Sequence, residues 1–270
     1  TLDMNYGVTD RFAVQVTVPY LKRHHQHFDE IGESPDELGE HSNFSDNGIG
    51  DVRVTAKYNV LPTLRNMLVL GFGMDLPTGD TRARDSGDHV LESSGQLGRG
   101  NVGLIGSIYQ TYELIPQRLN QFSYGSYRHT FRNRDGYQFG DEFLFNFGFN
   151  LVTLPWLVVT NQFNYRYLVH DNVRANLEQS APAFAGEEPT VIDPTVMNRR
   201  VPNTGSTYFA YTPGFQISLG DLVRSSWTDA TSVYFYTQIP VARDANNNLA
   251  QGTSFVFGIS KSFQLIKPGA

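Results

Sequence analysis

Cysteine is absent from this chain of 270 residues. Its absence excludes a disulfide framework, a thiolate metal site, a cysteine nucleophile and a CxxCH haem attachment site. Long apolar runs are missing too, because no stretch approaches the roughly 18 apolar residues that a membrane-spanning helix needs. Helical insertion into a membrane is therefore excluded. A transmembrane β-strand needs only about 10 residues, of which half can be polar.

Basic residues are in the minority. The 21 Lys and Arg residues face 27 Asp and Glu residues, which gives a formal net charge of -6, and no basic stripe is visible. Nucleic-acid-binding proteins usually carry a basic footprint, so a nucleic-acid partner is not expected. The chain opens at Thr1 without the charged and apolar regions of a signal peptide, which we expect to have been removed or to lie outside this sequence.

Aromatic side chains, by contrast, are abundant, with 19 Phe and 14 Tyr residues. Their clearest pattern is a run of alternating phenylalanines, Phe143, Phe145, Phe147 and Phe149. The residues between them are mostly small or polar. Successive side chains of a strand point to opposite sides of a sheet, so this segment has one oily face and one moderately polar face. Such a strand lines a soluble β-core or faces lipid, and one segment does not decide between the two.

Extended segments recur from end to end, and no stretch between them has a sustained helical period. The chain is therefore predicted to be all-β. The predicted strands number about eleven and lie near residues 1–8, 11–20, 50–60, 66–76, 100–113, 120–132, 141–153, 157–169, 205–219, 229–240 and 252–263.

The connections between these strands alternate in length. Short turns are predicted at 8–11, 61–65, 114–119 and 154–156, and long loops near 21–49, 77–100 and 170–204. Alternate connections of an up-and-down antiparallel sheet lie at opposite ends, so one end carries brief turns and the other carries large loops. Barrels of the bacterial outer membrane have this asymmetry, with short periplasmic turns and long extracellular loops, whereas a soluble β-sandwich generally does not.

We therefore predict a single domain, residues 1–270, that forms a transmembrane antiparallel β-barrel in the outer membrane of a Gram-negative bacterium. With the short turns in the periplasm, strand 1–8 and the last strand both run inward, and such strands do not pair antiparallel. A closed barrel in a single bacterial chain has an even number of strands, so we infer a missing strand before Thr1 and about twelve in all. The alternative is that residues 1–8 form no barrel strand and about ten strands close.

Three motifs in the first third of the chain resemble one family. They are NYGVTDRFAVQVTVPY at 5–20, GIGDVRVTAKY at 48–58 and LPTGD at 76–80. They are similar to the first hairpin, a strand opening and a strand exit of the outer-membrane proteins of the phenol-degradation meta-pathway, transporter-like β-barrels of largely unassigned function. The resemblance implies an outer-membrane location, passage of hydrophobic or aromatic small molecules, and an additional strand ahead of the first motif. It supplies no catalytic residues.

The less apolar face of each strand is predicted to line the pore. The pore-lining residues of this prediction are Gln15, Arg53, Lys57, Asp75, Asn146, Asn150, Gln162, Asn164, Arg166, Gln216 and Gln238. The four charged members form either a charged lining or cross-links that plug a narrow interior, since small barrels often fill themselves with side chains. Arg128 and His129 point to opposite sides of their strand, so only one of them faces inward.

No catalytic residue, cofactor or metal site is predicted. His170 with Asp171 is the best acid and base pair, yet no nucleophile motif lies nearby, and the spacing of His24, His25 and His27 matches no closed metal-ligand pattern. The leading hypothesis is a channel that contacts outer-membrane lipid and passes small, hydrophobic or aromatic solutes. The alternative is a barrel with a plugged lumen whose extracellular loops bind a protein partner.

Overall fold

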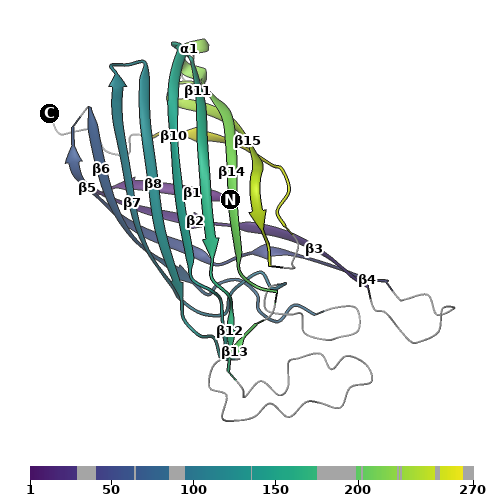
Figure 1. Ribbon diagram of the computed structural model, residues 1–270. Coiled ribbons are helices and arrows are strands. Elements are labelled where there is room, and N and C mark those ends of the chain that lie inside the picture. The colour runs from purple at the N-terminus through teal and green to yellow at the C-terminus, as the bar shows by residue number, and fades with distance from the viewer. Residues whose placement is uncertain are drawn as a thin grey trace, which may run out of the picture.

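The computed structural model describes residues 1–28, 41–63, 65–84, 95–134, 136–174, 199–201, 203–223, 225, 227–246 and 250–263. Regular structure in these ranges is almost entirely β-strand (Figure 1). The one helix among them is α1 (Leu219–Leu222), a single turn. No helix in the described ranges has the length and apolar character to cross a membrane.

An eleven-stranded sheet forms the body of the protein. Its strands pair antiparallel, each with the next along the sheet, in the order β1 (Leu2–Gly7), β2 (Phe12–Val18), β5 (Val52–Pro62), β6 (Asn66–Leu76), β7 (Gly103–Ile115), β8 (Leu119–Thr130), β10 (Glu142–Leu154), β11 (Leu157–Leu168), β14 (Ser206–Ser218), β15 (Thr231–Asp244) and β16 (Ser254–Lys261). All eleven predicted strands are present, with ends displaced by a few residues. The predicted all-β, up-and-down antiparallel fold is confirmed.

The sheet is rolled rather than flat, and β1 and β2 pass behind β10, β11 and β14 in the view of Figure 1. β1 and β16 stand at the two ends of the pairing order. Because every neighbour in this eleven-membered order is antiparallel, β1 and β16 run in the same direction. The twelfth strand expected ahead of Thr1 stays a prediction.

The long connections gather at one end of the sheet and the short turns at the other (Figure 1). Residues 21–49, expected to form only a solvated loop, instead contain two paired strands, β3 (Tyr20–Phe28) and β4 (His41–Ile49). Three short strands, β9 (Tyr137–Gln138), β12 (Asn172–Val173) and β13 (Arg199–Arg200), form a second small sheet at the same end. Paired backbone at these places satisfies amide groups that a bare loop would leave to water.

The two faces of the large sheet have opposite chemistry. Phe145 is 52% exposed, although it is a large apolar residue, whereas the polar Asn164 is 8% exposed. The exposed face carries Leu70, Phe72, Phe143, Phe145, Phe163, Tyr165, Phe215, Phe255, Phe257 and Ile259. The buried polar residues of the strands are Thr55, Asp75, Thr130, Glu142, Thr160, Asn164 and Thr212. This distribution is the reverse of that in a soluble β-sandwich and is the one that a lipid-facing barrel requires.

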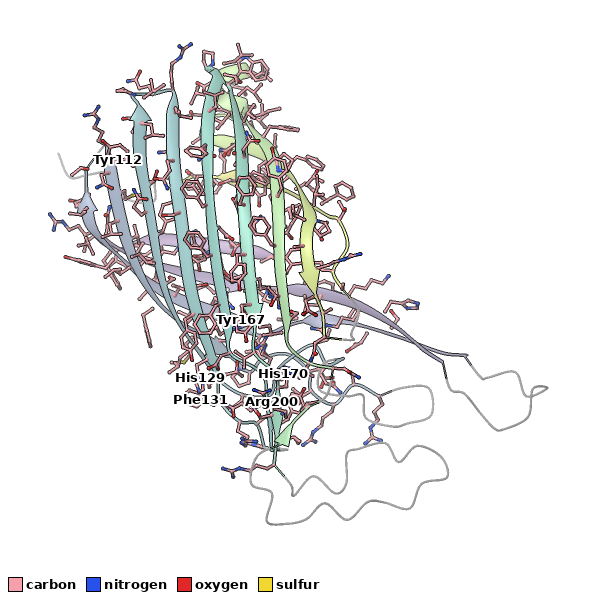
Figure 2. The ribbon with its side chains drawn as sticks, viewed as in Figure 1. Tyr112, His129, Phe131, Tyr167, His170 and Arg200 are labelled. Carbon is pink, nitrogen blue, oxygen red and sulfur yellow. The ribbon has the colours of Figure 1, made fainter. Side chains whose placement is uncertain are left out.

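Aromatic residues mark both edges of the apolar face. Tyr112 lies near the short-turn end, and Tyr167, His129 and Phe131 lie toward the loop end (Figure 2). Amphipathic rings are stable at the level of lipid headgroups, where one part of the ring is apolar and another is hydrated. The span between these rings is therefore the part of the sheet that meets the hydrocarbon core.

The phenylalanine run gives a direct test of this orientation. Phe145→Arg places a charge on the lipid-facing side and is expected to cost about 2–4 kcal/mol of folding free energy if Phe145 lies near the bilayer midplane. The measurement is reversible unfolding of the protein in lipid bilayers. The matched control is Asn146→Ala, whose side chain points to the other face and which is expected to be mild. Equal effects of the two substitutions would contradict the assignment of the faces.

Candidate functional site

The strand register places the predicted pore-lining residues on one face of the sheet, opposite the phenylalanine run. Residues directly opposite one another on paired strands face the same side. Asn146 is opposite Asn164, Asn150 is opposite Thr160, and Arg53 is opposite Asp75. Followed from strand to strand, the same pairing places Gln15 on β2 and Gln216 on β14 on this one face. That these residues line a pore stays a prediction.

Five charged residues form an alternating ladder across the inner face near the loop end. Arg53 Nε donates to Asp75 Oδ1 at 2.7 Å, and Arg128 Nη1 lies 3.6 Å from Asp75 Oδ2. Arg128 also pairs with Glu142, whose other oxygen accepts from Arg166 Nε at 2.6 Å. Each carboxylate is thus shared by two guanidinium groups. The carboxylate side chains are only 6% and 9% exposed, which is sustainable only because both are paired.

The ladder differs in part from the charged lining predicted from the sequence. Arg53, Asp75 and Arg166 belong to it, but Lys57 lies apart and donates to Asn5 Oδ1 at 3.3 Å. Glu142 was missed, although it stands one residue before Phe143 and so has the parity of the inner face. Arg128 is the inward member of the Arg128 and His129 pair.

His129 belongs to an outward cluster at the loop end (Figure 2). Its Nδ1 lies 2.8 Å from Asp141 Oδ1, and Tyr127 Oη donates to Asp141 Oδ2 at 2.6 Å. The His129 ring meets the ring of Phe131 edge-on, with centroids 5.1 Å apart. This cluster lies on the lipid-facing side of the sheet, whereas the ladder lies on the inner face.

The inner face also carries aromatic rings that pack over glycines on the neighbouring strand. A Cβ atom added at Gly148 would stand 2.7 Å from the Phe122 ring. Cβ atoms at Gly214 and Gly258 would overlap Tyr236 and Tyr234 in the same way. Because glycine leaves this space empty, the rings lie along the wall instead of projecting across the interior.

A cavity of about 480 Å³ lies at the loop end, next to the ladder. Arg53, Asp75 and Arg128 contribute one side of its lining. Residues 96–99 of the long connection between β6 and β7 contribute another, together with side chains that include Leu21, Phe139, Leu168 and Asp171.

Segment 96–99 is held in the cavity wall by two of the sequence motifs. Asp51, which ends GIGD, accepts hydrogen bonds from the backbone N–H of Gly79 at 3.1 Å and of Arg99 at 2.8 Å. Thr78, in LPTGD, donates to the Gly50 carbonyl at 2.8 Å. Burial raises the pKa of Asp51, and the two backbone N–H groups oppose that shift. The motifs therefore position the segment beside the ladder.

Glycine is required where this segment crosses the end of β6. A Cβ atom at Gly79 would stand 2.6 Å from Cα of Gly98, closer than real Cβ contacts. Gln96 is anchored to the end of the preceding described stretch, because its Oε1 accepts from the Ala83 N–H at 2.9 Å. The roles of Asp51 and Arg99 were missed from the sequence, because contacts between residues so far apart in the chain leave no local pattern.

The remaining predicted sites stand as follows. His170 lies at the loop end, and Asn246 Nδ2 lies 3.3 Å from its Nδ1. Asp171 accepts instead from the Gly140 N–H at 2.6 Å and from the Tyr137 hydroxyl. The side chains of His25 and His27 lie outside the described residues. Among the residues that the structure describes, no group of three or more His, Asp or Glu residues is arranged to hold a metal.

The shared carboxylate of Glu142 yields a stability prediction. Glu142→Gln removes the charge that Arg128 and Arg166 share and is expected to lower the unfolding free energy by about 3 kcal/mol, because a buried cation is left uncompensated. Denaturant unfolding in lipid bilayers measures the change. Asp10→Asn, an exposed carboxylate in the turn between β1 and β2, is the control and is expected to change stability by less than about 0.5 kcal/mol. Equal stabilities of wild type and Glu142→Gln would show that the ladder is not a stabilising network.

Comparison with known proteins agrees with this geometry. A family model described as "Putative MetA-pathway of phenol degradation" matches residues 4–197. The chain is also similar in structure to the COG4313 outer membrane channel from Pseudomonas putida F1, with a TM-score of 0.57 and 11% sequence identity over 94% of this chain and 77% of that chain. No curated protein matches. The fold is that of an outer-membrane β-barrel channel, and the predicted outer-membrane location is confirmed.

Proposed function

Because the chain belongs to this phenol-degradation family, as its three motifs suggested, we propose that it is a channel for passive passage of small aromatic or hydrophobic molecules across the outer membrane. The observation that carries the proposal is the inner face. The inner face combines hydrogen-bonding amides with aromatic rings that lie flat against the wall. The opposite face of the sheet is suited to lipid. The inner face thus offers partners to both parts of a phenol-like molecule.

The amides and hydroxyls of the inner face are partly engaged with one another. Thr160 Oγ1 donates to Asn150 Oδ1 at 2.7 Å, and Asn164 donates to Thr212. Amides that pair with neighbouring side chains lose little when a solute hydroxyl replaces one partner. Phe122, Tyr234 and Tyr236 supply ring faces on the same side of the sheet, against which an aromatic solute gains contact without a specific hydrogen bond.

The size of the barrel limits what passes. A sheet of eleven or twelve strands encloses a narrow lumen that admits small solutes but no folded protein. The predicted pore-lining residues, from Gln15 to Gln238, are the ones expected to meet the solute. Family and fold point to a channel, and we propose no catalytic role for His170 or its neighbour Asp171.

A second function is favoured by one observation, the narrowing of the loop end. The ladder and segment 96–99 both occupy that end, as a plugged barrel would require. The barrel then serves as a scaffold, and its long loops bind a protein partner. Conductance in planar bilayers separates the two functions: a steady ohmic current supports the channel, and its absence at high protein concentration supports the plugged scaffold.

A matched pair of substitutions tests whether the inner face lines the path. Asn146→Trp adds a bulky ring to the interior and is expected to lower single-channel conductance severalfold, because it narrows an already small lumen. Phe147→Trp is the control, since the next side chain along β10 points to lipid, and its conductance is expected to equal that of the wild type. Unchanged conductance in Asn146→Trp would rule out a path along this face.

A further inference from the structure

Arg99 is a half-buried cation without a carboxylate partner in the part of the chain that the structure describes. Its guanidinium carbon lies 4.9 Å from the centre of the Phe139 ring, and its Nη1 donates to Thr130 Oγ1 at 3.2 Å. The ion pairs of the described residues do not include it. A guanidinium has five N–H donors, so most of its hydrogen-bonding capacity is directed at the cavity or at solvent.

Arg128 is a second cation in the wall of the same cavity. Its terminal nitrogens are occupied by Asp75 and Glu142, but its Nε is buried and has no hydrogen-bond partner among the described atoms. An unsatisfied buried donor is costly, and a charged one more so. Both arginines line the cavity, and the charge of Arg128 repels that of Arg99.

The electrostatics of Arg99 agree with this picture. Burial, and repulsion from the nearby Arg128, lower its pKa to about 10, because Glu142, Asp75 and Asp171 only partly offset these two effects. Arg99 therefore stays cationic at neutral pH in an environment that disfavours its charge. An anion in contact with it would be stabilised.

The carboxylates that line the cavity are already committed to other donors. Asp75 pairs with two guanidinium groups of the ladder. Asp51 accepts from two backbone N–H groups, and Asp171 accepts from the Gly140 N–H and the Tyr137 hydroxyl. The cavity is thus left with donors to spare.

The lining also contains apolar side chains, one of which is an aromatic ring. Leu97, which is 6% exposed, and Phe139 stand beside Arg99, and Leu21 and Leu168 complete this side. A volume of about 480 Å³ falls in the usual range of small-molecule sites and accommodates a single substituted ring.

We propose that this cavity is a binding site for small aromatic carboxylates, in which the carboxylate pairs with Arg99 and the ring packs against Phe139 and Leu97. The proposal rests on the proposed channel function in that it names a solute class for the same pathway, and it places the first binding step at the loop end. Guanidinium groups suit this role because their planar fork matches a carboxylate.

Titration calorimetry of the full chain in detergent, with benzoate as the probe, tests the site. Wild type is expected to bind one benzoate, and Arg99→Gln is expected to weaken binding at least about tenfold, because a charge-assisted hydrogen bond is lost. Arg99→Lys keeps the charge without the fork and is expected to be intermediate. Arg118→Gln removes an exposed arginine from a short turn at the opposite end and is expected to bind like wild type.

Two further ligands separate the contribution of the carboxylate charge to binding from that of the aromatic ring. Benzyl alcohol, a neutral analogue, and acetate, which has no ring, are both expected to bind more weakly than benzoate. Benzyl alcohol binding as tightly as benzoate, or Arg99→Gln retaining wild-type affinity, would overturn the proposal. Arg99 and Arg118 variants that both migrate as folded barrels in unheated gels exclude misfolding as the cause of lost binding.

Measuring both conductance and benzoate binding of the wild type tests the channel and the binding site separately. A wild type that conducts in planar bilayers but does not bind benzoate refutes the site and leaves the channel standing. A wild type that binds benzoate but does not conduct refutes the channel and leaves the site standing.

Discussion

The fold depends on one constraint: a backbone N–H or carbonyl inside a lipid bilayer has no water to bind, so it must find its partner within the protein. The eleven strands meet this demand by pairing antiparallel, each with the next strand along the sheet. Because the pairing uses only the backbone, it leaves side-chain chemistry free to follow the two media. Phe143 and Phe145 can therefore face lipid while Asn146, between Phe145 and Phe147, faces the interior.

The same freedom lets the interior concentrate charge, but only under a second condition. A carboxylate such as Asp75 or Glu142, nearly shut off from solvent, is tolerable when cations surround it. The ladder meets this condition with three guanidinium groups for two carboxylates. Arg99, brought in by its own long connection, adds a further cation at the point where the ladder meets the cavity. The loop end therefore has more guanidinium donors than carboxylates to accept from them, because the ladder surrounds each buried carboxylate with two guanidinium groups.

Local pattern predicted the strands well, because alternation and turn residues act over a few positions. Local pattern did not decide the two faces of β8, because aromatic rings occur on both: Phe122 points inward and Tyr127 outward. The sequence therefore did not show which face Arg128 occupies. Hairpin β3 and β4 was missed because its polar sequence lacks an apolar face. The contact of Asp51 with the Arg99 backbone joins residues 48 positions apart, and no local rule predicts it. Tertiary contacts of this kind create the cavity.

The overall charge of the chain does not determine what this cavity attracts. With a formal net charge of -6, the protein as a whole repels anions at long range. At physiological ionic strength, however, charges are screened beyond about 8 Å, so a solute that reaches the loop end meets mainly the groups that line the cavity. There, Asp51 and Asp171 are taken up by backbone N–H groups and a tyrosine hydroxyl, while the guanidinium of Arg99 lies against a ring. A negative protein can therefore hold a cavity in which a guanidinium group meets a small solute, and what binds there depends on which donors remain free near the ladder.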